Sequence, residues 1–219
     1  MHVLDLLPRK RGPFQVLCLG AHPDDIEIGC GGLVLSLLAL GRKIEISWIV
    51  FSATTARERE ARRSAARFLR RATQQRVRVE QFRDGYFPYA GEQLKESFEQ
   101  AAAEWPSPDL ILTHYRHDRH QDHRMVSDLT WNTFRDHLVL EYEIPKYDGD
   151  LGNPNCLFPV TRGTALRKVG YLESMFASQR AKHWFDRETF LGLMRLRGME
   201  CRAPEGYAEA FHARKLTLG

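Results

Sequence analysis

The sequence predicts an α/β fold in which a mostly parallel β-sheet carries helices on both faces. Between residues 14 and 115, short apolar segments alternate with longer segments of helical periodicity, an order typical of parallel sheets. Residues 29–40 are apolar almost all round, as expected of a helix deep inside a fold. The 219 residues are 43% hydrophobic and 27% charged, which excludes disordered and disulfide-scaffold classes.

The individual elements follow from local patterns. Five segments are short, apolar and bounded by loop residues, which predicts strands at 14–20, 43–51, 76–82, 109–115 and 138–144. Helical periodicity and end signals predict helices at 29–40, 55–71, 94–105, 122–138, 162–180 and 186–197. A last strand is expected within 208–218. Thr55 and Glu58 suggest a capping box, and Gly198 suggests the end of the last helix, which Asp186 caps. The Pro- and Gly-rich stretch 145–160 predicts a long loop.

Length and cysteine usage narrow the class of protein. A chain of this size buries about 70% of its surface, so we expect one domain spanning 1–219. The four cysteines are widely spaced without a CxxC pair, which argues against a disulfide framework and a thiolate zinc finger. The N-terminus does not have the order of a signal peptide, and no apolar run approaches the roughly 18 residues of a membrane helix. We therefore expect a cytoplasmic protein without membrane insertion.

The first segment that carries chemistry is 20–27 (GAHPDDIE), directly after the first strand. Sites in open α/β sheets form beyond the carboxyl ends of strands. His22 and Asp25 are three residues apart on a turn and are candidates to bind one cation, which leaves Asp24 for acid–base chemistry. The alternative is that Asp24 or Asp25 only caps a helix that begins near Glu27.

The second such segment is 114–123 (HYRHDRHQDH), which holds four of the nine histidines at intervals of three. It follows the fourth strand, so we expect it at the same sheet edge as residues 20–27. Imidazole and carboxylate together suit zinc, with one coordination position left for water. The spacing leaves open which histidine is the third ligand, and a solvated loop is the alternative for any single one.

Nine arginines between positions 57 and 78 form a third feature. One interpretation is a solvated helix face opposite the apolar stripe of the same helix. The other is contact with an anionic substrate or with nucleic acid. No helix-turn-helix, RRM or KH motif accompanies the arginines, so a phosphorylated or nucleotide-linked substrate fits them better than nucleic acid.

Residues 29–32 (GCGG) differ from a nucleotide-binding loop because they do not match GxGxxG and follow acidic residues that would repel phosphate. We expect these glycines to allow close packing between a helix and a strand. Cys30 is then a small core residue rather than a metal ligand.

The sequence AHPDDIEIGCGG at 21–32, followed by HQDH at 120–123, resembles the PIG-L/LmbE-like family of zinc-dependent N-deacetylases. The resemblance implies a Rossmann-like fold with its metal site at the carboxyl ends of the strands. It implies a metal-binding core over about 14–140 and a substrate-specificity region over about 141–219. The metal would be Zn²⁺, or another divalent ion such as Fe²⁺, with His22, Asp25 and His123 as ligands.

The resemblance also implies catalytic roles. Asp24 would be the general base, His120 would steady the oxyanion or protonate the leaving amine, and Asp122 would orient a histidine. Candidate substrate contacts are Arg57 and, in the second half, Tyr147, Asp148 and Asp150. Glu209, which lies between apolar neighbours, either reaches the pocket or pairs with an arginine.

The function implied is a metal-dependent hydrolase that removes the N-acetyl group from an amino sugar or glycoconjugate. The expected partner is a small N-acetyl sugar, a nucleotide sugar or a glycoconjugate, without nucleic acid; a homo-oligomer is compatible with the sequence. One alternative is a related amidase acting on a larger acyl group or a thiol conjugate. Others are an anion- or nucleic-acid-binding protein and an inactive relative, against which the intact Asp24 argues.

Overall fold

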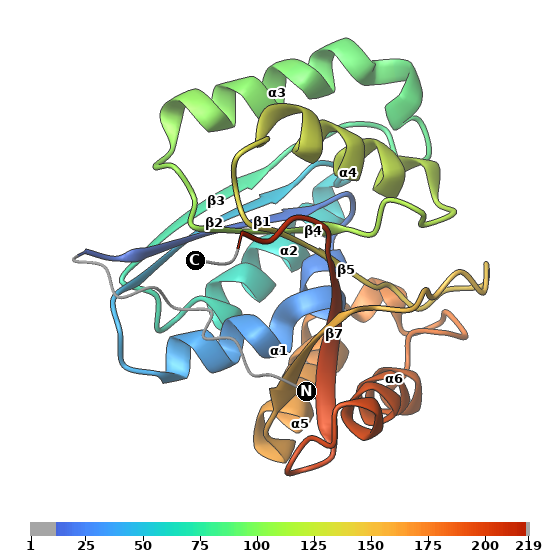
Figure 1. The fold of residues 1–219 in the computed structure, drawn as a ribbon. Coiled ribbons are helices and arrows are strands. Elements are labelled where there is room, and N and C mark those ends of the chain that lie inside the picture. The colour runs from blue at the N-terminus through green and yellow to red at the C-terminus, as the bar shows by residue number, and fades with distance from the viewer. Residues whose placement is uncertain (1–11, 218–219) are drawn as a thin grey trace.

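The computed structural model describes residues 12–217 and confirms the α/β, Rossmann-like architecture. Seven strands form one sheet in the order β3-β2-β1-β4-β5-β7-β6 (Figure 1). The first five are parallel, and β7 runs antiparallel to both of its neighbours. The strands are β1 Phe14–Gly20, β2 Ile44–Val50, β3 Gln74–Val79, β4 Leu110–His114, β5 Val139–Tyr142, β6 Cys156–Val160 and β7 Tyr207–Ala213.

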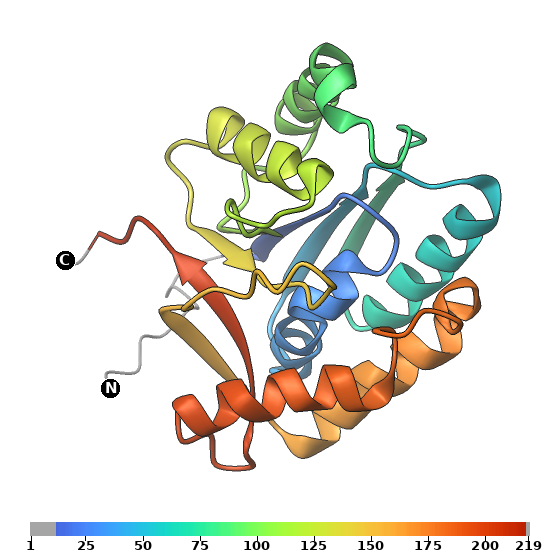
Figure 2. The same cartoon turned by 90° about the vertical axis from the view of Figure 1, so that its right-hand side faces the viewer.

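Helices cover both faces of the sheet (Figures 1 and 2). Helices α3 and α4 lie on one face, α1, α2 and α5 on the other, and α6 packs against β7. The helices are α1 Asp25–Ala39, α2 Thr55–Phe68, α3 Gly91–Glu104, α4 Gln121–Thr133, α5 Arg162–Met175 and α6 Arg187–Glu200, with short 3₁₀ helices η1 Phe87–Ala90 and η2 Ala177–Gln179. Within residues 12–217, no helix combines the length and apolar character needed to cross a membrane.

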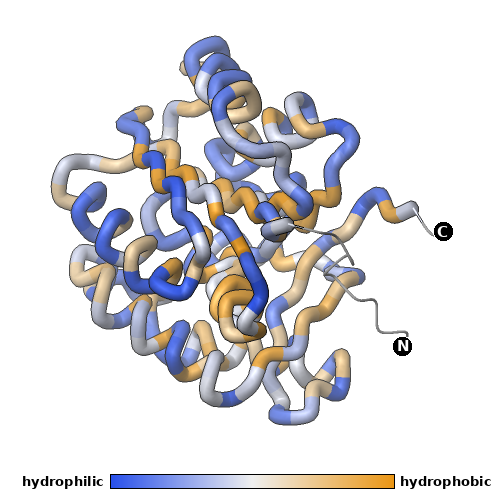
Figure 3. Tube along the Cα trace, turned by 90° about the vertical axis from the view of Figure 1, so that its left-hand side faces the viewer, coloured by the Kyte–Doolittle hydropathy of each residue, from blue (hydrophilic) through white to orange (hydrophobic). Residues whose placement is uncertain are grey.

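Alternating side chains of the central strand supply both cores. Val16 and Cys18 of β1 belong to the core shared with α1, α2 and α5, whereas Leu17 and Leu19 belong to the core under α3 and α4. This follows because successive side chains of a strand point to opposite faces of the sheet. Figure 3 shows hydrophobic residues concentrated along the strands in the middle of the molecule.

Helix α1 is buried because its glycines let neighbouring elements approach its axis. A Cβ on Gly29 would lie 2.1 Å from the ring of Tyr142 in β5, and one on Gly32 would lie 2.8 Å from the carboxylate of Glu209 in β7. The predicted close packing of strands on this helix is therefore confirmed. Cys30 is fully buried as a core residue, as expected.

A buried ion pair, the Lys168–Glu209 clamp, holds the middle of α1. Glu209 accepts hydrogen bonds from the N–H groups of Gly32 and Leu33, each at 2.7 Å. Lys168 Nζ donates to Glu209 Oε1 and to the Ile28 carbonyl, both at 2.6 Å. A regular helix pairs the N–H of Gly32 with the carbonyl of Ile28, and the clamp binds both of these groups. The prediction for Glu209 is wrong, because its partner is a lysine of α5 and it does not reach the functional site.

Several predicted helix ends are wrong. Helix α1 begins at Asp25, four residues earlier than expected, and α2 ends at Phe68. The N-cap of α2 is Thr54 and its side chain makes no cap hydrogen bond, so the predicted capping box is not formed. Helix α4 ends at Thr133, because the chain must turn back to enter β5 at Val139.

The C-terminal half shows further differences. The predicted loop 145–160 ends in a strand, β6. Pro159 argued against a strand in the sequence, but proline is tolerated there because β6 is an edge strand. Helix α5 ends at Met175, where Phe176 turns into the core. Asp186 caps α6 as predicted, but Gly198 lies inside that helix, where a Cβ would meet the backbone of Gly206 at 2.2 Å.

Candidate functional site

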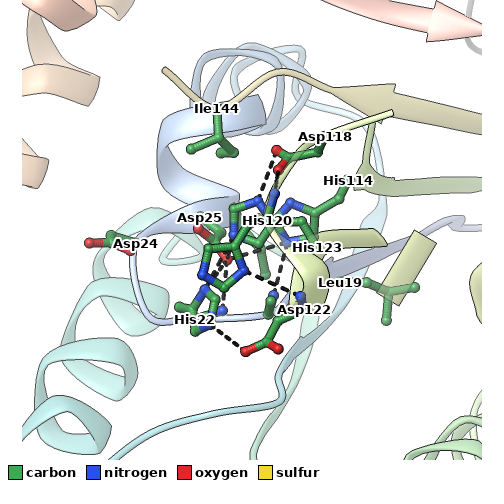
Figure 4. Close-up of polar contacts among 12 residues, drawn as sticks. Leu19, His22, Asp24, Asp25, His114, Asp118, His120, Asp122, His123 and Ile144 are labelled. Atoms are coloured by element: carbon green, nitrogen blue, oxygen red, sulfur yellow. Dashed lines mark hydrogen bonds and ion pairs between the residues drawn. The ribbon is translucent and has the colours of Figure 1, made fainter. Parts of the chain in front are cut away.

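The carboxyl ends of β1 and β4 bring the two motif segments together. These strands pair directly with each other, so the residues that follow them are neighbours. Residues 22–25 lead from β1 into α1, and residues 118–123 lead from β4 into α4 (Figure 4). The two segments therefore meet at one edge of the sheet, as the sequence predicted.

Three acceptor atoms face one another at the centre of this site. His22 Nδ1 lies 3.3 Å from His123 Nε2 and 3.4 Å from Asp25 Oδ2. His123 Nε2 lies 3.5 Å from the same oxygen. A tetrahedral zinc ion with ligands at 2.0–2.1 Å holds its ligand atoms about 3.3 Å apart. The three side chains, each at most 10% exposed, thus fit a tetrahedral cation.

Neighbouring carboxylates decide which nitrogen of each histidine faces the centre. His22 Nε2 lies 3.1 Å from Asp122 Oδ2 and 3.1 Å from Asp84 Oδ1. His123 Nδ1 lies 2.9 Å from Asp118 Oδ2. Because a carboxylate accepts the N–H of each neutral ring, lone pairs remain on His22 Nδ1 and His123 Nε2. In these forms, two lone pairs and a carboxylate oxygen at such short separations suit one shared divalent cation.

Burial and neighbouring charges set the protonation of these three candidate ligands. Burial lowers the pKa of His22, but its carboxylate partners, above all Asp122, raise that pKa well above its ordinary value. Burial and the nearby His114 lower the pKa of His123. Burial also acts to raise the pKa of Asp25, but the surrounding histidines hold it well below its usual range. His123 and Asp25 are thus held in the neutral and anionic forms that bind metal, whereas His22 must release a proton when a metal binds.

Two further histidines lie against the ligands. Potential ligand atoms also converge in overlapping groups: His22, His120 and His123; His22, Asp84, His120 and Asp122; Asp25, His114 and His123. His114 stacks on His123 at 4.0 Å, and its Nε2 accepts the N–H of Ala21. His120 is the N-cap of α4, where its Nδ1 accepts the N–H of Asp122 at 3.3 Å. In the neutral ring the proton of His120 is therefore on Nε2.

Asp24 points away from the three ligands (Figure 4). Its φ of 98° lies in the left-handed region, which is strained for a residue with a side chain. Its carboxylate makes no helix-cap hydrogen bond, so the capping alternative does not apply to it. Arg57 Nη2 lies 3.0 Å from Asp24 Oδ2 and also binds the Pro23 carbonyl. Burial raises the pKa of Asp24 to about 7, against the opposing effect of Arg57.

A cavity of about 360 Å³ opens beside His22, Asp24 and His120. Of the predicted substrate contacts, Arg57, Tyr147 and Asp148 line it. Asp150 does not, because it pairs with Lys146 and accepts the N–H of Arg119. Ile144 and Lys146 also line the cavity. So do Asp84, Gln179, Lys182 and Trp184, which sequence reasoning missed. They lie in segments without a motif, and Gln179 was assigned to a continuous helix.

Asp118, which sequence reasoning also missed, links the candidate ligand His123 to a lysine. Its Oδ2 accepts from His123 Nδ1 and from Lys146 Nζ, both at 2.9 Å. We expect Asp118→Asn to weaken metal affinity about 10–100-fold, because the charge that orients the ligand and increases its basicity is lost. Competition with a chromophoric chelator measures this. Asp150→Asn is the matched control, since Asp150 binds the same lysine without touching His123; equal losses in both variants would contradict the prediction.

Known proteins share both the motif region and the fold. Residues 17–134, just over half of the chain, match the family model described as PIG-L: GlcNAc-PI de-N-acetylase. No curated protein matches the chain in sequence. The conserved protein TT1542 from Thermus thermophilus is 20% identical, with a TM-score of 0.68 over 93% of this chain and 96% of that chain.

Two further solved structures are similar at low identity. The N,N′-diacetylchitobiose deacetylase from Pyrococcus horikoshii is 19% identical, with a TM-score of 0.63 over 91% of this chain and 83% of that one. GalB, the 4-carboxy-2-hydroxymuconate hydratase from Pseudomonas putida KT2440, is 15% identical, with a TM-score of 0.67 over 94% and 99%. These structures share the fold, and the match over residues 17–134 shows that the chain belongs to the PIG-L family.

Proposed function

We propose that this protein is a metal-dependent hydrolase that removes the N-acetyl group from an amino sugar or glycoconjugate. The observation that carries the proposal is the set of three facing ligand atoms beside a buried, separate carboxylate, Asp24. Family membership supports it, as does a deacetylase among the proteins that share the fold. The mixed His and Asp ligands suit Zn²⁺, and Fe²⁺ is the alternative.

A divalent ion at this site supplies two effects, a lower pKa for water and polarisation of the amide carbonyl. Asp24 accepts a proton from the water that attacks the acetamide, and Arg57 holds its carboxylate in place. His120 lines the cavity, and its neutral ring, which carries the proton on Nε2, donates to the developing oxyanion or to the leaving amine. The Asp122 carboxylate binds His22 Nε2 and so orients the His22 ring. The amide and water become acetate and a free amine.

The cavity has the size and lining of a small-molecule site. Its volume of about 360 Å³ falls in the range of roughly 300–1,000 Å³ that is usual for such sites. We propose that Tyr147 and Asp148 bind sugar hydroxyls, and that Trp184 supplies an apolar wall. The lining is of mixed charge, because the cations Arg57, Lys146 and Lys182 stand beside the carboxylates of Asp24, Asp84 and Asp148, which suits a polar substrate such as a sugar.

Release of carboxylate from a set of N-acylated sugars tests the proposal. The metal-loaded protein is incubated with N-acetyl, N-propionyl and N-butyryl glucosamine, with N-acetylglucosamine glycoconjugates and with thiol conjugates. We expect acetate from one or more N-acetyl compounds and none after chelation of the metal. Faster release of a longer acyl group would favour the alternative amidase. No carboxylate from any compound, with metal bound, would contradict amide hydrolysis and favour the water-addition chemistry of the hydratase that shares the fold.

A further inference from the structure

The structure separates the nine arginines of 57–78 by their partners. Five bind other groups: Arg57 binds Asp24, Arg62 binds Glu58, Arg63 binds the Met175 carbonyl, Arg76 binds Glu45, and Arg78 binds Glu104. The other four are Arg59, Arg67, Arg70 and Arg71. Within residues 12–217 the side chains of these four make no ion pair or hydrogen bond, and that of Arg67 lies over the ring of Tyr171 at 4.9 Å. The proposed reaction uses only Arg57.

Three of these four arginines, Arg67, Arg70 and Arg71, line a groove together with Arg167 of α5. The groove measures about 190 Å³. Its floor is apolar and aromatic and consists of Leu35, Leu38, Phe68 and Tyr171. No acidic side chain lines it within the described part of the chain. We call Arg67, Arg70, Arg71 and Arg167 the arginine groove.

The arginine groove is separate from the metal site. Arg57 lies in the first turn of α2, whereas Arg70 and Arg71 follow its last turn. At 1.5 Å per residue this places them about 20 Å away along the helix. None of the four arginines lines the cavity at the metal site.

The four charges of the arginine groove lack local compensation. The acidic residues of the same helices are engaged elsewhere: Glu58 with Arg62, Glu60 with Ser178 and Glu173 with Arg187. Four like charges around one small groove repel one another. A multiply charged anion in the groove would remove this repulsion, and its binding should therefore be favourable.

We propose that the arginine groove binds the diphosphate group of a small ligand. Guanidinium groups are planar forks that bind phosphate oxygens in pairs, and four of them match a diphosphate better than a single carboxylate. The apolar floor offers contact for the organic part of such a ligand. A groove of about 190 Å³ holds a compact group rather than a strand of nucleic acid, which needs a longer charged track with stacking platforms.

Calorimetric titration of the full chain with inorganic pyrophosphate tests the proposal. Pyrophosphate also binds metals, so the protein is first freed of metal and its fold checked by circular dichroism. At constant ionic strength we expect one binding site per chain. Arg70→Gln and Arg167→Gln should each weaken binding at least about tenfold, because each removes charge-assisted hydrogen bonds to phosphate. The pyrophosphate affinity of Arg70→Lys, which keeps the charge but loses the planar guanidinium, should lie between that of the two glutamine variants and that of the wild type.

Arg59→Gln is the matched control, since Arg59 is on the same helix and free of partners but outside the groove. It should bind pyrophosphate as the wild type does. Equal weakening in Arg59→Gln would overturn the proposal, because it would show only diffuse attraction to a basic surface. Equal affinity for orthophosphate would overturn the diphosphate assignment. Displacement of pyrophosphate by single-stranded RNA at lower concentration would instead assign this surface to nucleic acid.

Discussion

Replacing Asp24 with asparagine is expected to lower kcat about 10²–10⁴-fold, the usual contribution of a positioned general base. The variant should keep its metal, because Asp24 is not among the three facing ligand atoms. Asparagine is the appropriate substitution because it tolerates the left-handed backbone that Asp24 adopts at φ 98°. Loss of rate then reports the missing carboxylate rather than a rearranged turn. The rate of acetate release and the metal content are measured together.

Asp148→Asn is the control for this variant, since Asp148 is an exposed carboxylate that lines the same cavity. We expect it to change KM at most and to leave kcat near the wild-type value. An Asp24→Asn variant with near wild-type kcat would remove Asp24 from the proton transfer. An Asp24→Asn variant without metal would instead make Asp24 a ligand.

Removing the proposed ligand His123 is expected to abolish metal binding. A catalytic zinc site has three protein ligands, and His123→Ala leaves two, with the buried Asp118 deprived of its histidine partner. Plasma mass spectrometry of protein purified without added metal should find about one metal per wild-type chain and almost none in His123→Ala or His22→Ala.

His117→Ala provides the matched control, because His117 belongs to the same histidine-rich segment but is exposed and outside the ligand set. It should keep its metal. Circular dichroism of all three variants separates loss of a ligand from loss of the fold. A wild-type protein that takes up no zinc even on reconstitution, or a His123→Ala variant that retains it, would contradict the assigned site.

The sequence predicted the sheet and the meeting of the two motifs because both depend on short-range patterns. Apolar segments alternate with helical ones, and residues after parallel strands share an edge. Partners across the site could not be predicted in the same way. The family resemblance implied that Asp122 orients a histidine, and its carboxylate contacts His22. Neither the resemblance nor the spacing pointed to Asp118, which makes the corresponding contact with His123. The side chain of Asp84 contacts His22 from a loop without any motif.

The wall of the cavity was less predictable for a different reason. Helical periodicity continued past Met175, so residues near Gln179 were assigned to a helix, and only the burial of Phe176 against the core explains why the helix stops. Strand β6 was not predicted because it contains Pro159. A proline is tolerated in this strand only because the strand lies at the edge of the sheet. Both outcomes are decided by tertiary packing rather than by local sequence.

The Lys168–Glu209 clamp also affects the order in which parts of the protein fold during synthesis. Glu209 binds N–H groups that lie 176 and 177 residues earlier in the chain. Proteins emerge N-terminal end first during synthesis, and contacts of such long sequence separation form late. The hydrogen bonds from Glu209 to the helix that begins at Asp25, a proposed metal ligand, therefore form only after the C-terminal strand β7 has joined the sheet. A nascent chain in which both proposed metal-binding motifs have emerged therefore still lacks the contacts of β7 that fix α1. We expect it to bind the metal ion tightly only after β7 is in place.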